Sequence, residues 1–342
     1  MDLTAHEPKD ATFAEALRRK IDGKTKPVGA LGRIEALAAQ VARVQGRLAP
    51  RMARCRLTIF AADHGIAAEG VSAYPQAVTR QMVLNFLDGN AAANVFARSV
   101  GAELRVVDAG VAGEPIADPR LVARRIGPGT RNALREPAMT AAERHRALAE
   151  GRALGGDGSF DAVAFGEMGI ANTSAATLVA HKLAGLPLAL LTGRGTGLDD
   201  AGLARKEAVL ATAARRTAPR LDAGTALAEY GGFEIAMMAG AMLGAAEARR
   251  IVIVDGFIAA AAALVAVALD AQAAGALVFA HRSAEHGHAA LLAHLGAEPL
   301  LDLGMRLGEG TGALLAWPLV RAAAAMLTEM SSFDSAGVSG PA

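Results

Sequence analysis

The sequence has few of the features that mark disulfide-linked, membrane-spanning or nucleic-acid-binding proteins. Its single cysteine, Cys55, excludes an internal disulfide and is expected to be a small buried thiol, which fits a reducing cytoplasm. The longest uncharged apolar run, Phe257 to Leu269, is too short to cross a bilayer and predicts a core helix. No basic segment followed by an apolar one opens the sequence, so we expect no secretory signal.

Charge is also nearly balanced, with 35 Lys and Arg against 34 Asp and Glu. A net charge of +1 supplies no field that would gather a polyanion over the whole surface. We therefore expect neither nucleic acid nor a membrane as a partner. The 342 residues are 52% hydrophobic, which excludes a disordered chain and suffices for one large core or two modest ones.

Six short runs are almost continuously apolar, as in strands that are covered on both faces. They span residues 56–62, 103–109, 161–166, 186–192, 250–254 and 276–280. Alanine-rich stretches that predict helices lie between them, for example 79–98, 173–184, 201–217, 231–249 and 257–273. This alternation predicts an α/β fold with a parallel sheet of about six strands and helices on both faces.

Three segments do not follow the alternation. Residues 1–50 predict helices with a break at residues 26–29, and residues 311–342 predict a helix that Pro318 interrupts, followed by a polar tail. We expect 1–50 and 311–342 to form one small helical domain beside a large domain at 51–310. The segment 113–135 is rich in Pro, Gly and Arg and predicts an irregular loop.

A cluster of glycine and polar residues follows each predicted strand. These clusters lie at 63–65, 108–110, 166–176, 193–200, 255–257 and 281–288. Parallel sheets bind their ligands beyond the carboxyl ends of the strands. The sequence therefore predicts one shared ligand crevice.

Two of these clusters have the composition of anion-binding loops. In GEMGIANTSAA (166–176), Thr173 or Ser174 could cap a helix whose first N–H groups would hold a phosphate, although a tight turn without a ligand has the same pattern. GRGTGLDD (193–200) offers Arg194, and Lys206 follows it, as countercharges. Two such loops favour a phosphorylated substrate. ATP and NAD are disfavoured, because GxxxxGK[ST] is absent and no strand–helix junction matches GxGxxG.

The histidines do not form a recognisable metal motif. HExxH is absent around Glu285, His286 and His288, and no set of cysteines is available, so we expect no metal and no other cofactor. His281 and His288 are expected to bond loop backbones. His64 either transfers a proton or holds the turn at Asp63, and the residues leave both open.

Two glutamates each allow two interpretations. Glu309 stands between two glycines just before the last helix, where partial removal of water would raise its pKa and make it a general base. The same position near a helix N-terminus favours negative charge without any catalytic role. Glu234 lies in GGFEIAMMAGAMLGAA, whose glycines indicate close helix packing around a buried, hydrogen-bonded carboxylate more readily than a site.

Eight ordered motifs between about residue 20 and residue 338 together resemble the nicotinate-nucleotide:dimethylbenzimidazole phosphoribosyltransferases of cobalamin biosynthesis. They are KPVGALGRIE (26–35), ADHGIAAEGVSAYPQAVTRQMVLNF (62–86), GEMGIANTSAA, GRGTGLDD, GGFEIAMMAGA, VDGFIAAAAAL, HRSAEHGH and LLDLGMRLGEGTGALLA. Two positions depart from the family pattern, since Ala30 and Ala171 replace a usual Ser and Gly. Ala171 would matter if its backbone needed a positive φ.

The resemblance implies an activity: nicotinate mononucleotide and 5,6-dimethylbenzimidazole give α-ribazole 5′-phosphate and nicotinate. It also implies a Rossmann-like large domain, a small helical domain from both termini, and a homodimer in which a neighbouring subunit helps close the site. Glu309 would be the general base and Glu167 would line the same pocket. By the same matching, Gln81 would lie near the benzimidazole, and Gly169, Asn172, Thr173, Gly193 and Lys206 near the ribose phosphate or the departing nicotinate.

This chemistry calls for a base and no acid. The donor carries a pyridinium at C1′, which leaves as a neutral nitrogen, while the attacking benzimidazole must lose a proton. Glu167 would stabilise cationic ribose or orient a ribose hydroxyl, and the apolar segment 82–86 would supply a slot for the base. Two alternatives remain: a nucleoside phosphorylase or other phosphoribosyltransferase, which would need phosphate or magnesium, and a catalytically silent nucleotide-binding homologue.

Overall fold

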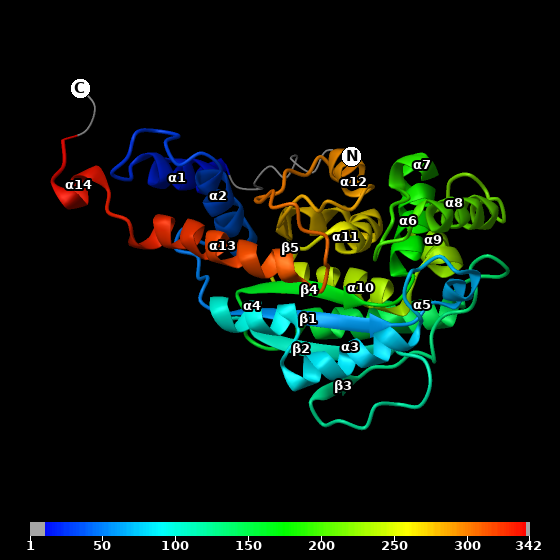
Figure 1. Ribbon diagram of the computed structural model, residues 1–342. Coiled ribbons are helices and arrows are strands. Elements are labelled where there is room, and N and C mark those ends of the chain that lie inside the picture. The colour runs from blue at the N-terminus through cyan, green and yellow to red at the C-terminus, as the bar shows by residue number, and fades with distance from the viewer. Residues whose placement is uncertain (1–10, 340–342) are drawn as a thin grey trace.

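A computed structural model describes residues 11–339 and contains one parallel sheet of six strands (Figure 1). The strands are β1 Cys55–Ala62, β2 Glu103–Gly110, β3 Leu121–Ala123, β4 Ala162–Met168, β5 Ile251–Val254 and β6 Leu277–Phe279. Their order across the sheet is β3-β2-β1-β4-β5-β6, the order of a doubly wound Rossmann-type sheet. The predicted α/β fold is confirmed.

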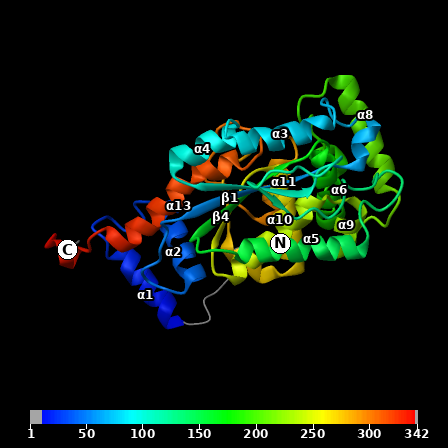
Figure 2. The same cartoon turned by 90° about the horizontal axis from the view of Figure 1, so that it is seen from below.

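Helices cover both faces of the sheet. They are α1 Ala11–Asp22, α2 Arg33–Gln45, α3 Ala77–Asp88, α4 Ala92–Val100, α5 Ala141–Gly156, α6 Asn172–Ala184, α7 Leu188–Leu191, α8 Asp200–Ala214, α9 Ala223–Tyr230, α10 Phe233–Glu247, α11 Phe257–Leu269, α12 His288–Leu295, α13 Thr311–Glu329 and α14 Phe333–Ala336. Short 3-10 helices span Gly65–Glu69 and Ala271–Ala276. In Figure 2, α3, α4 and α13 lie on one side of β1 and β4, and α5 and α10 lie on the other.

The alternation of side chains along the strands builds two separate cores. Leu57 and Ile59 of β1 belong to the core under α2, α3, α4 and α13, while Phe60 packs into the core formed with α5, α6, α10 and α11. The ring of Phe60 meets that of Phe165 in β4, with centroids 6.0 Å apart. Strands that are buried on both faces have no polar face, which explains their continuous apolar runs.

Five of the six predicted strands are present, but the prediction at 186–192 is wrong. This segment forms the short helix α7 after Pro187. Its leucines and alanine are strong helix formers without β-branched side chains, so apolarity alone gave a misleading signal. The strand that the sequence did not predict is β3. It lies in the segment 113–135, for which the sequence predicts an irregular loop, and it pairs only three residues with β2.

Two helix predictions also need correction. The stretch 79–98 is two helices, because Gly89 adopts a left-handed φ of 81° and ends α3. In contrast, α13 runs through Pro318 without interruption. Packing of α13 against α2 and α4 outweighs the one backbone hydrogen bond that proline cannot make.

Both ends of the described chain meet at one end of the molecule (Figures 1 and 2). Helix α2 packs on α13, and a backbone bridge joins Lys24 to Ser332. Residues 1–10 and 340–342 of the expected small domain lie outside the described residues, and the division into two domains stays a prediction. By length and composition α13 could cross a membrane, but most of it is buried in this core.

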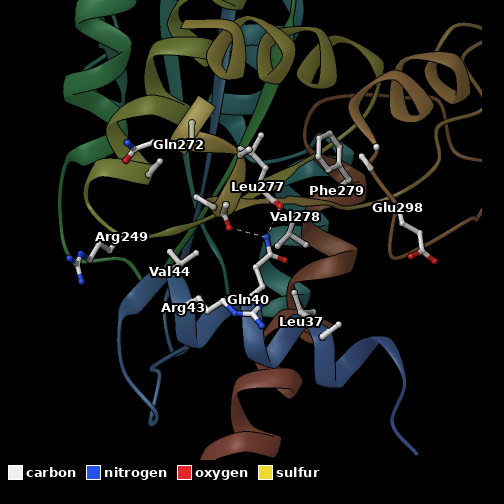
Figure 3. A pocket seen from close by; sticks show the side chains of 18 of the residues that line it. Leu37, Gln40, Arg43, Val44, Arg249, Gln272, Leu277, Val278, Phe279 and Glu298 are labelled. Carbon is white, nitrogen blue, oxygen red and sulfur yellow. Dashed lines mark hydrogen bonds between the residues drawn. The ribbon is translucent and has the colours of Figure 1, made fainter. Parts of the chain in front are cut away.

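The edge of the sheet at β6 borders a cavity of about 1210 Å³. Figure 3 shows Gln40 of α2 reaching across it, with its Nε2 donating to the carbonyls of Gly275 and Leu277 at 3.1 and 2.8 Å. This amide therefore ties α2 to the edge strand β6 and to the 3-10 helix that precedes it. None of the residues that line the cavity belongs to the carboxylate cluster described next.

Candidate active site

The candidate site lies where the strand order reverses, beyond the carboxyl ends of β1 and β4. In open α/β sheets this switch point is where ligands bind. Glu167 in β4 pairs in register with Phe60 in β1, and His64 lies in the loop that follows β1. The loops 166–172, 193–200, 281–288 and 301–310 meet there through hydrogen bonds or close backbone approach. The prediction that 193–200 follows a strand is wrong, but this loop still reaches the shared edge.

Glu167 is a buried residue, with an exposed fraction of 8%. Its side chain accepts a hydrogen bond from Asn172 at the start of α6. Burial raises the pKa of Glu167 to about 8, and the carboxylates of Asp255, Glu234 and Glu309 add to this rise while Asn172 opposes it. A carboxyl of this kind can hold a proton at neutral pH.

Glu309 projects from a turn in which three consecutive residues have positive φ. Gly308, Glu309 and Gly310 have φ of 82°, 62° and 81°. Burial raises the pKa of Glu309 to about 7, opposed by the N–H of Ala93 at the start of α4 and aided by Asp255. Its Oε2 is buried and has no hydrogen-bond partner among residues 11–339. The N–H that contacts Glu309 thus comes from the start of α4, and not from the helix that follows Glu309 in the sequence.

Asp255 holds this turn in place. It follows β5, and its two carboxylate oxygens accept from the N–H groups of Gly310 at 3.2 Å and Ala313 at 2.9 Å. His281 lies beyond it, with Nε2 3.8 Å from Oδ1. The sequence placed Asp255 at a strand end but assigned it no role, because only the fold shows that its partners belong to the start of α13.

The loop before α6 departs from the expected capping. Ala171 precedes the helix with a φ of 75°, and neither Thr173 nor Ser174 caps it. The positive φ explains why glycine suits this position in the family pattern, since a Cβ there is strained. The N–H of Ile170 donates to Thr79 Oγ1 at 3.1 Å, which ties the loop to α3.

Lys206 lies buried between the two glycine-rich loops. Its Nζ donates to Thr173 Oγ1 and to the carbonyl of Gly193, both at 3.0 Å. Burial lowers the pKa of Lys206 to about 8, against the opposing effect of Glu285. An ammonium has three N–H donors, so one remains for an anion.

Two other residues that were assigned to the site, Arg194 and Gln81, are exposed. Arg194 is exposed and pairs with Asp200, so its guanidinium is already engaged. Gln81 is exposed on α3. In the segment 82–86, Val83 and Phe86 belong to the core, whereas Leu84 is 42% exposed.

Three histidines near the site, His64, His281 and His288, are buried. His64 Nε2 lies 2.6 Å from Glu234 Oε1, and both side chains are buried. His288 Nδ1 accepts from the N–H of Ser283 at 2.9 Å, as expected of a histidine that bonds a loop backbone. Among residues 11–339, no group of three or more His, Cys, Asp or Glu side chains is arranged to hold a metal ion.

Known proteins resemble this chain over nearly its whole length. Residues 6–338 match the family described as Phosphoribosyltransferase. Nicotinate-nucleotide:dimethylbenzimidazole phosphoribosyltransferases from Aromatoleum aromaticum and Ralstonia nicotianae are 55% and 56% identical, covering 99% of this chain and 99% and 96% of their own. The solved structure of the corresponding Thermus thermophilus protein is 43% identical, with a TM-score of 0.92 over 97% of this chain and 100% of its own. The family prediction made from the eight motifs is thereby confirmed, and this chain belongs to the phosphoribosyltransferase family that contains these proteins.

Proposed function

We propose that this enzyme transfers the 5-phosphoribosyl group of nicotinate mononucleotide to 5,6-dimethylbenzimidazole, giving α-ribazole 5′-phosphate and nicotinate in the assembly of the cobalamin nucleotide loop. Relatives with this name match the whole chain at more than half identity. The observation that carries the proposal is the pair of buried carboxyls, Glu167 and Glu309, whose pKa values are raised to about 8 and about 7.

Glu309 acts as the general base in this proposal. When one benzimidazole nitrogen bonds to C1′, the other becomes acidic and loses its proton to the unpartnered Oε2 of Glu309. A carboxyl with a pKa near 7 is half ionised at neutral pH and still basic enough to accept the proton. Attack opposite the leaving pyridine inverts C1′ and gives the α product.

The mononucleotide occupies the other half of the site. Lys206 offers its free N–H to the phosphate, beside Thr173 and Gly193, and Gly169 and Asn172 supply the backbone turn before α6. Glu167 faces the ribose, where it stabilises cationic character or orients a hydroxyl. Gln81 and Arg194 belong to the outer rim, because both are exposed in one subunit.

A homodimer completes the site in this proposal, and the enzyme works in the cytoplasm. Leu303 and Leu307, which precede the Glu309 turn, are each 57% exposed. Apolar side chains so close to a catalytic turn are well suited to contact with a second subunit. The single buried thiol of Cys55 is consistent with a reducing compartment.

The test mixes purified protein with nicotinate mononucleotide and dimethylbenzimidazole and identifies the product and its anomer by NMR. We expect α-ribazole 5′-phosphate in stoichiometric amount with nicotinate, at the same rate with and without a chelator. A need for inorganic phosphate would favour a phosphorylase. A need for magnesium would favour a diphosphate-dependent transferase, and no turnover at all would favour a silent homologue.

A further inference from the structure

A buried pair of side chains that the proposed chemistry does not use lies beneath the loop before α6. His64 follows β1, and Glu234 stands in the first turn of α10, with His64 Nε2 2.6 Å from Glu234 Oε1. The exposed fractions of the two side chains are 1% and 0%. Because Nε2 is engaged by the carboxylate, this nitrogen is not free to exchange a proton with a ligand.

Two glycines make room for the pair. A Cβ on Gly232 would lie inside van der Waals distance of the His64 ring and of the Glu234 carboxylate. A Cβ on Gly169 would lie 3.4 Å from His64 Nε2 and would clash with the carbonyl of Ala62. The imidazole therefore fills the space directly under Gly169, and the loop rests on it.

The pair also interacts electrostatically with the neighbouring carboxyl groups. Burial disfavours the imidazolium, but the carboxylates of Glu234 and Asp63 outweigh this effect and raise the pKa of His64 above its ordinary value. Within the described part of the chain, Glu234 Oε2 has no hydrogen-bond partner. The negative charge of Glu234 contributes to the raised pKa of both Glu167 and Asp63, which face it from the ends of β4 and β1.

We propose that His64 and Glu234 are positioning residues for the mononucleotide half of the site. The pair holds the loop Gly169–Asn172 in position. It thereby also positions the backbone N–H groups at the start of α6. Thr79 holds the same loop from the side through Ile170, and the pair supports it from below. This inference rests on the proposed function, since it names which substrate depends on the pair.

The test measures KM for each substrate separately. His64→Ala removes the ring under Gly169, so we expect KM for nicotinate mononucleotide to rise at least tenfold while KM for dimethylbenzimidazole stays within twofold. His64→Gln should bring KM back to within about threefold of wild type, because its amide can still donate to Glu234. Lys182→Met is the matched control, since Lys182 is equally buried but bonds the carbonyls of Ala214, the last residue of α8, and of Ala218 in the loop that follows. It should lower the melting temperature without changing either KM.

A second measurement does not depend on turnover. Hydrogen exchange of the amides of residues 169–172 should become at least tenfold faster in His64→Ala and should stay unchanged in Lys182→Met. If His64→Ala does not fold, Glu234→Gln is measured in the same two ways, because it leaves the imidazole in place and removes its partner's charge.

Equal changes in both KM values, or unchanged KM values and exchange rates, would overturn the inference. Wild-type protein that makes no α-ribazole 5′-phosphate would instead overturn the proposed function, and the exchange measurement would still report on the loop.

Discussion

Glu309 occupies a backbone position that disfavours its own side chain. A non-glycine residue at a φ of 62° costs on the order of 1 to 3 kcal/mol, and such strain is found chiefly where it serves a function. Asp255 bonds the backbone on the helical side of the turn and keeps it in this conformation. The strain is therefore consistent with a carboxyl that is needed at this place rather than a chance choice of residue.

Replacing Glu309 by Gln should remove the base without changing the shape of the turn. We expect Glu309→Gln to lose at least a hundredfold in kcat, about 3 kcal/mol of transition-state stabilisation, while still binding dimethylbenzimidazole in calorimetry. In the wild type, kcat/KM should fall about tenfold per pH unit below the pKa of about 7, because only the carboxylate accepts a proton. In Glu309→Gln, kcat/KM should not fall in this way as the pH is lowered. A variant with normal turnover would contradict the assignment of Glu309 as the base.

The raised pKa of Glu309 also predicts how the stability of the protein depends on pH. A carboxyl whose pKa rises from 4.5 to about 7 on folding binds its proton more tightly in the folded protein. Its contribution to stability is therefore greatest below pH 4.5 and is lost as the pH rises through 7. We expect urea unfolding to show Glu309→Gln more stable than wild type by on the order of 1 to 3 kcal/mol at pH 8, with little difference at pH 4. A constant difference across this range would contradict the raised pKa.

Among the helices, α5 and α10 approach each other so closely that their backbones are in contact. Cβ atoms added to Gly151 and Gly155 of α5 would collide with backbone atoms of Met237 and Ala241. Those added to Gly240 and Gly244 of α10 would collide with the backbone of α5 in the same way. The interpretation of the glycines in 231–249 as close helix packing is therefore confirmed for Gly240 and Gly244.

A single methyl group in this contact should separate the helices. We expect Gly240→Ala to destabilise the protein by about 3 kcal/mol or more, because the group it meets is backbone and cannot move aside. Gly156→Ala at the end of α5 is the matched control, since its Cβ would lie 3.6 Å from the carbonyl of Gly244, an ordinary contact. In thermal unfolding, Gly240→Ala should melt at a clearly lower temperature than Gly156→Ala. Equal melting temperatures would contradict a direct backbone contact between the two helices.

Considering the molecule as a whole, two apolar residues that precede the Glu309 turn are exposed. Leu303 and Leu307 lie in an irregular segment that leads to Glu309, and Arg306 of the same segment donates to the carbonyl of Gly195 at 3.3 Å. A second subunit seated there would shield both leucines and restrict water at the base. The proposed homodimer and the proposed catalysis are therefore linked.

Charge placed on this segment should separate the subunits and lower activity together. We expect the double variant Leu303→Glu, Leu307→Glu to sediment as a monomer with at least tenfold lower kcat, while the wild type sediments as a dimer. Leu269→Glu is a control, because Leu269 is also exposed, at 42%, but ends α11. A wild-type monomer with full activity would contradict the proposal.

The α/β class, five of the six strands and the polar loops that follow those five strands could be predicted from the sequence alone. These features are local or periodic, so apolar runs and glycine clusters indicate them directly. The family was predicted separately, from the resemblance of eight ordered motifs. The strand prediction was wrong at 186–192 and missed β3, because a leucine-rich run suits a helix as well as a strand and three residues carry too little pattern.

The use of polar residues that lie far apart in the sequence could not be predicted, because it depends on how the chain packs. Asp255 supports the Glu309 turn, His64 pairs with Glu234, and Lys206 bridges two loops, although each pair of partners is separated by many residues in the chain. The raised pKa values of Glu167 and Glu309 likewise arise from burial among other carboxylates. Burial and mutual distance are properties of the packed chain, and no single stretch of sequence contains them.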